Sequence, residues 1–85
     1  MTVYVYVLRS LTTGSFYVGI SKSPTKRQRQ HNRDQSKGTR GKGPWEEVLR
    51  EPYPDYITAR RREKHLKSGQ GRAWLRSAYG GQGSS

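Results

Sequence analysis

The first twenty residues constrain the fold most, because they contain two β-rich runs separated by a short turn sequence. Residues 3–8 (VYVYVL) and residues 15–20 (SFYVGI) are dominated by β-branched and aromatic side chains. Thr12, Thr13 and Gly14 lie between them, and this pattern predicts an antiparallel β-hairpin. The first run is apolar on both faces, which is typical of a strand covered from both sides.

The second run alternates. Tyr17 and Gly19 therefore lie on the face opposite to that of Phe16 and Val18. This alternation means that Tyr17, like Tyr6 of the first run, need not be a core side chain.

The rest of the sequence predicts helices and one further strand. Ser23 and Pro24 provide an N-cap and a first helical position for a helix that extends to Asn32, and Asp55 offers an N-cap for a second helix. In chain order we expect a basic loop over 33–43, a strand over 45–50, a helix over 56–67, a short helix over 72–79 and a disordered tail over 80–85. The predicted fold class is α/β: a small, mainly antiparallel three-stranded sheet flanked by helices, in a single domain over 1–79.

The charge balance points to an anionic partner. Seventeen Lys and Arg residues against six Asp and Glu residues give a formal net charge of +11. Nucleic acid is the usual partner of such a chain, since each neutralised phosphate releases condensed counterions. A basic surface without a function, or a basic ribosome-associated or nucleoid protein, would also explain the charge.

Other features of the composition exclude several classes of protein. The chain contains no cysteine, which excludes disulfide frameworks, zinc ribbons and zinc knuckles and fits a reducing cytoplasm. No apolar run approaches the roughly 20 residues that span a bilayer, and the amino terminus lacks the pattern of a secretory signal. We therefore expect a cytoplasmic protein without a membrane partner, whose oligomeric state stays open.

Two segments carry polar residues at unusual places. The predicted helix that ends at Asn32 has no large apolar residue from Thr25 onward, and Arg27 and His31 share one side of it at i and i+4. Such a helix suggests a ligand-facing surface.

Glu63 falls on the expected buried stripe of the helix over 56–67, together with Tyr56, Ala59 and Leu66. A buried carboxylate requires a salt bridge, a metal ion or a raised pKa. On the residues alone a salt bridge to a neighbouring cation and a metal site both remain open.

These residues together resemble the GIY-YIG nuclease superfamily over nearly the whole chain. Residues 4–6 (YVY) and 17–19 (YVG) stand where its two signature triplets lie, and Tyr6 and Tyr17 have the family's interval. Neither triplet is specific by itself; the match depends on their combination with Arg27, His31 and Glu63 on later helices.

The likeness is strongest to short stand-alone bacterial members, which share pairs such as His31-Asn32 and Pro44-Trp45, and it extends more distantly to the nuclease domain of the UvrC excision-repair protein. Residues 4 and 5 replace the glycine and isoleucine of the first triplet. Pro24 and Gln28 occupy positions that are often leucine in relatives.

The resemblance implies that water hydrolyses a phosphodiester bond, leaving a 5′-phosphate and a 3′-hydroxyl. Tyr6 would act as the general base, with its pKa lowered from about 10 toward neutrality. Tyr17 would position the phosphate or exchange roles with Tyr6, and Arg27 would stabilise the transition state. His31 would bind a phosphate oxygen, help Tyr6 lose its proton or protonate the leaving oxygen. Glu63 would hold one Mg²⁺ or Mn²⁺ ion.

Each residue also has a plainer interpretation. Tyr6 would then be a core aromatic, Arg27 a solvated cation and His31 a surface residue. We expect Trp45 and Trp74 to be core residues rather than base-stacking platforms.

The expected substrate is DNA, single-stranded or branched rather than plain duplex. The candidate contacts in the substrate groove are Lys22, Arg29, Lys37, Arg40 and Lys42. A non-catalytic nucleic-acid-binding protein of the same fold is the alternative.

Overall fold

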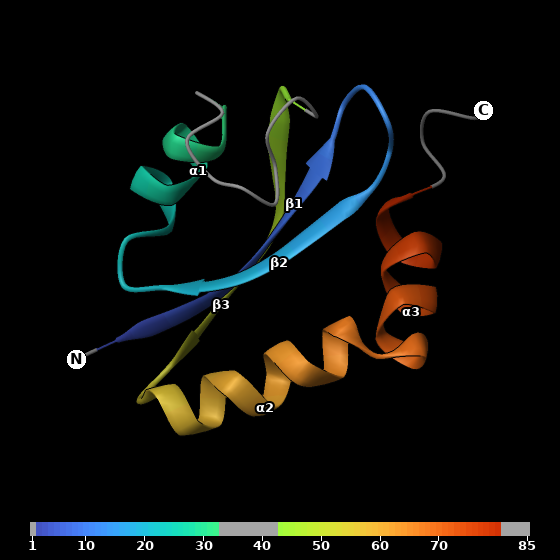
Figure 1. Ribbon diagram of the computed structural model, residues 1–85. Helices are drawn as coiled ribbons and strands as arrows, with labels where there is room; N and C mark the ends of the chain where they lie inside the picture. Colours follow the sequence, from blue (N-terminus) through green and yellow to red (C-terminus); the bar gives the residue numbers. More distant parts are fainter. Residues whose placement is uncertain (1, 33–42, 81–85) are drawn as a thin grey trace.

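The computed structural model describes residues 2–32 and 43–80. Its elements in chain order are β1 (Val3–Ser10), β2 (Phe16–Ser21), α1 (Pro24–Asn32), β3 (Trp45–Tyr53), α2 (Tyr56–Lys67) and α3 (Gly69–Tyr79). The strands form one sheet in the order β2-β1-β3, and β1 pairs antiparallel with both neighbours. The predicted hairpin and α/β fold class are therefore confirmed (Figure 1).

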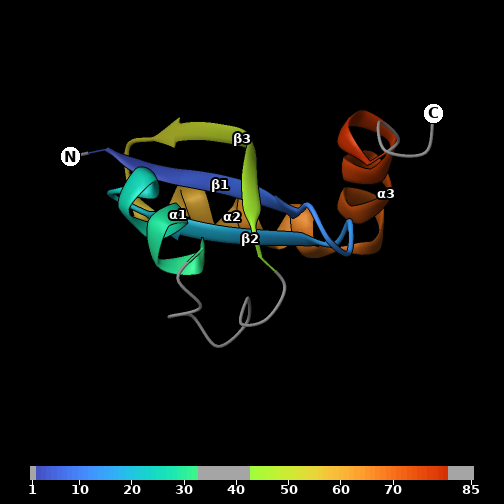
Figure 2. The same cartoon turned by 90° about the horizontal axis from the view of Figure 1, so that it is seen from above.

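The sheet separates two layers of helix. Figures 1 and 2 show α1 on one face of the sheet, α2 on the other, and α3 beside the turn that joins β1 to β2. The alternation of β1 supplies both layers: Val3, Val5 and Val7 join the core beneath α2 and α3, whereas Tyr6 and Leu8 form a second cluster on the α1 side. Since both faces are covered, the apolar character of β1 on both sides is explained.

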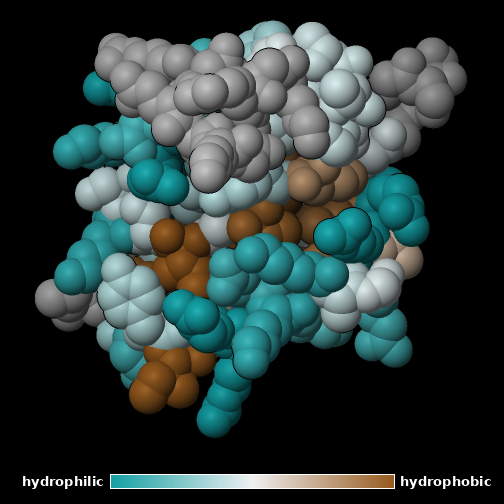
Figure 3. Space-filling view, viewed as in Figure 1, coloured by the Kyte–Doolittle hydropathy of each residue, from teal (hydrophilic) through white to brown (hydrophobic). Residues whose placement is uncertain are grey.

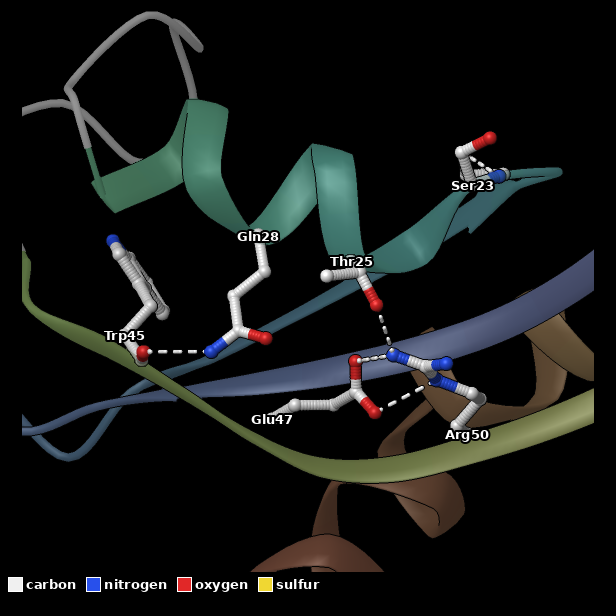
Figure 4. A network of polar contacts seen from close by, with 7 residues as sticks. Ser23, Thr25, Gln28, Trp45, Glu47 and Arg50 are labelled. Atoms are coloured by element: carbon white, nitrogen blue, oxygen red, sulfur yellow. Dashed lines mark hydrogen bonds and ion pairs between the residues drawn. The ribbon is translucent and has the colours of Figure 1, made fainter.

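Helix α1 is attached to β3 by polar contacts in place of an apolar stripe. The Gln28 and Asn32 side-chain amides donate to the Trp45 carbonyl oxygen at 3.4 and 3.3 Å. At the other end of the helix, the Arg50 guanidinium donates to the Thr25 hydroxyl at 3.0 Å (Figure 4). These bonds explain how a helix with so few apolar residues is held on the sheet.

Two elements differ in their bounds from the prediction. Strand β3 extends to Tyr53, beyond the expected 45–50, because Tyr53 still pairs with Val3 at the start of β1. Helix α3 begins at Gly69 and not at residue 72, since the Ser68 hydroxyl accepts a hydrogen bond from the Gly71 amide at 3.2 Å and so caps the new helix. Of the predicted loop over 33–43 and the predicted tail over 80–85, residues 33–42 and 81–85 lie outside the described residues.

Two aromatic residues were wrongly expected to be buried. Tyr56 is 47% exposed, because it begins α2, and the Lys22 ammonium lies 6.0 Å from its ring centre. Trp74 is 43% exposed and packs edge-on against Tyr79, with the Arg62 guanidinium 5.4 Å from its ring centre. Trp45, in contrast, is a core residue, as expected.

Candidate active site

The hairpin places Tyr6 directly over Gly19. The two residues are partners across β1 and β2, and a Cβ atom at position 19 would come within 2.6 Å of the Tyr6 ring and hydroxyl. Because real Cβ atoms do not approach so closely, only glycine permits this position of the ring. The glycine of the YVG triplet thus gives the Tyr6 ring its place.

The Tyr6 hydroxyl meets His31 of α1. Its oxygen lies 3.1 Å from His31 Nε2, and both side chains are fully buried. The half-buried Tyr17 ring lies 4.5 Å from the His31 ring and 6.3 Å from the Tyr6 ring, measured between centroids. The hairpin and α1 therefore bring together both tyrosines and the histidine.

The His31 imidazole is neutral at pH 7. Burial, reinforced by the charge of Arg27, lowers the pKa of His31 to about 4. The Arg27 guanidinium beside Tyr6 can only donate hydrogen bonds, so it cannot accept the Tyr6 proton. We therefore assign Tyr6 as the donor and His31 Nε2 as the acceptor.

The expected low pKa of Tyr6 is wrong for this structure. Burial raises the pKa of Tyr6 above 10.0, because tyrosinate is costly away from water, and the hydrogen bond from Arg27 offsets only part of the effect. Tyr6 is therefore a protonated phenol at neutral pH.

Arg27 lies beside both tyrosines. Hydrogen bonding to Tyr6, and more weakly to Tyr17, raises the pKa of Arg27, and its Nη1 donates to Gln30 Oε1 at 2.7 Å. Because the side chain is only partly buried, the guanidinium stands between the buried pair and the surface. It is therefore placed to receive an anion there.

Glu63 lies on the other face of the sheet from these four residues, because it belongs to α2. Its side chain is 16% exposed, and Lys67 Nζ lies 3.1 Å from its Oε2. This is a salt bridge to a nearby cation, one of the two alternatives that the sequence left open. Because α1 and α2 pack on opposite faces of the sheet, a site that combines all five residues would have to join Glu63 to the other four around the edge of the sheet.

One groove borders both the cluster of Tyr6, Tyr17, Arg27 and His31 and the ion pair of Glu63 and Lys67. It measures about 490 Å³ and is lined by residues 14–18, the end of α2 and residues 72, 75 and 76 of α3. Tyr17 of the first group and Lys67, the partner of Glu63, both line it. We call it the β2–α3 groove.

A comparison with protein families finds that the family described as the GIY-YIG catalytic domain matches residues 2–76. The chain belongs to the GIY-YIG family. A solved structure, the solution NMR structure of a UPF0213 protein from Bacillus halodurans, is 33% identical to it. The match covers 96% of this chain and 89% of that one, with a TM-score of 0.55. A search of curated proteins found no match.

GIY-YIG proteins are nucleases, and a divalent metal is common in the family. The donor set here fits one hard cation only in part: Glu63 provides a carboxylate, and no group of three or more potential ligands gathers within residues 2–32 and 43–80. Water and a phosphate oxygen of the substrate would have to complete the coordination. Lys67 would have to release the carboxylate oxygen that it now binds.

The expected DNA contacts of this GIY-YIG chain are only partly described. Lys22 and Arg29 are exposed, on the approach to α1 and on α1 itself. Lys37, Arg40 and Lys42 lie outside the described residues. Across the part of the chain that the structure covers, no helix has the length and apolar character needed to cross a membrane.

Sequence reasoning missed three residues of this site. Gln30 orients Arg27, and nothing in its position indicated this. Lys67 pairs with Glu63, which their i and i+4 spacing could have suggested. Gly19 was read only as part of a triplet, although glycine in a strand often marks a close approach.

Proposed function

We propose that this GIY-YIG protein is a divalent-metal-dependent DNA endonuclease that hydrolyses phosphodiester bonds, acting in the cytoplasm on single-stranded or branched DNA. The observation that supports this most is the contact between Tyr6 and His31 with Arg27 beside them. A buried phenol and a neutral imidazole in contact can pass a proton between them, and the partly exposed guanidinium beside them can bind an anion.

In this proposal Tyr6 relays a proton. As water attacks the phosphorus, its proton moves to the Tyr6 oxygen while the Tyr6 proton moves to His31 Nε2. The raised pKa of Tyr6 is compatible with this relay, since no tyrosinate has to form beforehand. The resulting imidazolium is stabilised by the negative charge that builds up on the phosphate.

Arg27 and Tyr17 hold the phosphate in the proposed reaction. The planar guanidinium suits the equatorial oxygens of the pentavalent phosphate. Tyr17 is more exposed than Tyr6 and also lines the β2–α3 groove, so its hydroxyl orients the bound strand. If water instead binds to Tyr17, Tyr17→Phe will abolish cleavage more completely than Tyr6→Phe.

Glu63 is the proposed metal ligand. A Mg²⁺ or Mn²⁺ ion there would withdraw charge from the phosphate and its leaving oxygen. The released Lys67 ammonium would then be free to bind a phosphate oxygen.

Cleavage of labelled single-stranded, duplex and branched DNA with Mg²⁺ or Mn²⁺ tests the proposal. The wild-type protein and Glu46→Gln should cut, whereas Glu63→Gln should lose cleavage and keep DNA binding. Glu46 is a matched control because it is also an ion-paired glutamate, but on β3 and exposed. If the wild type cuts none of these, or Glu63→Gln cuts equally well, the proposed mechanism is wrong.

A non-catalytic DNA-binding protein of the same fold is the second candidate. It is favoured by the salt bridge that occupies Glu63 and by the complete burial of Tyr6. The same assay decides between the two, since this protein would bind DNA in a salt-dependent way and cut none of it.

A further inference from the structure

The β2–α3 groove has an apolar floor and a cationic rim. Phe16 is the half-buried apolar side chain of the floor, and the core residues Val18, Leu66 and Leu75, at most 7% exposed, lie beneath it. Arg72 and Arg76 of α3 line the groove with Lys67. In the space-filling view, apolar surface is exposed across the middle of the molecule, where β2 runs in Figure 1, and hydrophilic side chains border it (Figure 3).

The charge around the groove is of one sign apart from Glu63. Neither β2 nor α1 nor α3 contains an acidic residue. The acidic residues of β3, on the far edge of the sheet, are instead engaged with cations: Glu46 with Arg9, Glu47 with Arg50 and Glu51 with Arg62. The electrostatic potential therefore favours an anion at the β2 edge and not at the β3 edge.

An apolar floor beneath a cationic rim fits one kind of anion best. In a duplex the bases are stacked inside, and only phosphates and groove edges meet the protein. An unpaired strand offers exposed bases to an apolar surface and phosphates to cations at the same time. The volume of about 490 Å³ lies within the range of roughly 300–1,000 Å³ typical of small-molecule-sized sites, so the groove has room for a nucleotide.

We propose that the β2–α3 groove binds an unpaired segment of the strand to be cut, with Arg72 and Arg76 on its phosphates and a base or sugar on the apolar floor. The inference rests on the proposed function, because the groove borders the proposed catalytic residues. Tyr17, which lines the groove, is a neighbour of Arg27 and His31. Lys67, which also lines it, forms a salt bridge with Glu63. A strand in the groove would thus enter the site between the two groups.

The β2–α3 groove lies apart from the DNA contacts expected from the sequence. Lys22 and Arg29 lie at α1, on the other side of β2. A duplex region could therefore contact α1 while its unpaired end follows the groove. This geometry favours an overhang or a flap over a blunt duplex.

Binding is measured without divalent metal, so that no strand is cut, by fluorescence anisotropy of an oligonucleotide. The double variant Arg72→Ala/Arg76→Ala should bind a single strand about tenfold more weakly and lower the salt slope by about 0.7 for each lost phosphate contact. The matched control is Arg60→Ala/Arg61→Ala, which removes the same charge from an exposed side of α2 away from the groove. Its effect should be about threefold or less.

A second groove variant tests the inference even if Arg72→Ala/Arg76→Ala does not fold. Ser15 is exposed and lines the groove, so Ser15→Glu should repel the strand without touching the core, whereas Ser77→Glu on the exposed side of α3 should have a smaller effect. Circular dichroism confirms that each variant is folded.

The contribution of the bases is tested with an abasic oligonucleotide of equal length and charge. The wild type should bind it several-fold more weakly than the normal strand, because nothing packs on the apolar floor.

Equal losses in the groove variants and their controls would overturn the inference, as would equal binding of the abasic strand. Self-association of the protein blocked by Ser15→Glu, with DNA binding unchanged, would also overturn it, since the groove would then bind a second copy. Failure of the nuclease proposal gives a different result: no cleavage when Mg²⁺ is restored, with the binding differences intact.

Discussion

Gly19 and Tyr6 are in contact across β1 and β2, and the missing side chain at position 19 is what leaves room for the tyrosine ring. The ring lies over Gly19, and its hydroxyl oxygen is 3.1 Å from His31 Nε2. Gly19 of the second signature triplet thus leaves room for Tyr6 of the first. Strand β1 supplies the hydroxyl and β2 supplies the space for its ring.

Gly19→Ala should therefore disrupt the site. The new Cβ would lie 2.6 Å from Tyr6 Cζ, and the ring or the strand must move, which costs about 1–3 kcal/mol in the free energy of unfolding. Cleavage should fall at least tenfold, because the hydroxyl leaves His31. Gly69→Ala is the control, since nothing lies within 4 Å of its added Cβ. Thermal unfolding and single-turnover cleavage of both variants measure the difference; a harmless Gly19→Ala would show that the contact does not position Tyr6.

Much of this fold could be predicted because its signals are local. The β-branched runs, the Gly14 turn and the Asp55 cap each depend on neighbouring residues, and the structure has the expected sheet and helices. Periodicity also identified Ala59 and Leu66 as buried residues of α2. Local patterns are sufficient wherever the same residues decide both the element and its buried face.

What the sequence could not predict depends on contacts between distant elements. Trp74 packs against Arg62 and Tyr79 at the surface and not in the core, and no local sequence pattern indicates such contacts. The pKa of Tyr6 depends on how far α1 excludes water from it, so the many cations of the sequence suggested the wrong direction. Periodicity placed Glu63 on an inward stripe but could not show that α1 and α2 pack on opposite faces.

His31 should make the protein less stable in mild acid. Its pKa is about 4 in the folded protein against 6.5 as the ordinary value, so between these pH values the unfolded chain binds a proton that the folded chain does not. The free energy of unfolding should thus be fully retained above pH 6.5 and decrease by up to about 3 kcal/mol as the pH falls to 4.

His31→Gln should flatten this dependence, because glutamine can accept the Tyr6 hydrogen bond and does not titrate. His65→Gln is the control, since His65 is exposed on α2. Urea unfolding of the three proteins between pH 4 and 7 gives the comparison. The assignment of the acid dependence to the buried pair is wrong if the two variants respond alike.

Arg27→Lys should reduce the cleavage rate by about 10²–10³-fold while leaving DNA affinity within about threefold. Lysine keeps the charge but loses the planar set of donors that now serves Tyr6, Tyr17 and Gln30. Lys26→Arg, an exposed change on the same helix, should leave the rate unaltered. Single-turnover rates and binding constants are both needed: a loss of affinity without a loss of rate would make Arg27 a DNA contact and not a transition-state group.

Lys67→Ala should strengthen metal binding at Glu63. The ammonium lies 3.1 Å from Glu63 Oε2 and both competes for that oxygen and repels a cation, so its removal should tighten binding about threefold to tenfold. Mn²⁺ binding without DNA, followed by electron paramagnetic resonance, separates this effect from any role of Lys67 in holding the strand. Lys64→Ala removes the same charge from the same helix without breaking the Glu63 salt bridge, and it should change Mn²⁺ affinity less. If both variants tighten binding equally, the pairing with Lys67 does not control the site; if neither binds Mn²⁺ more tightly, Glu63 is not its ligand.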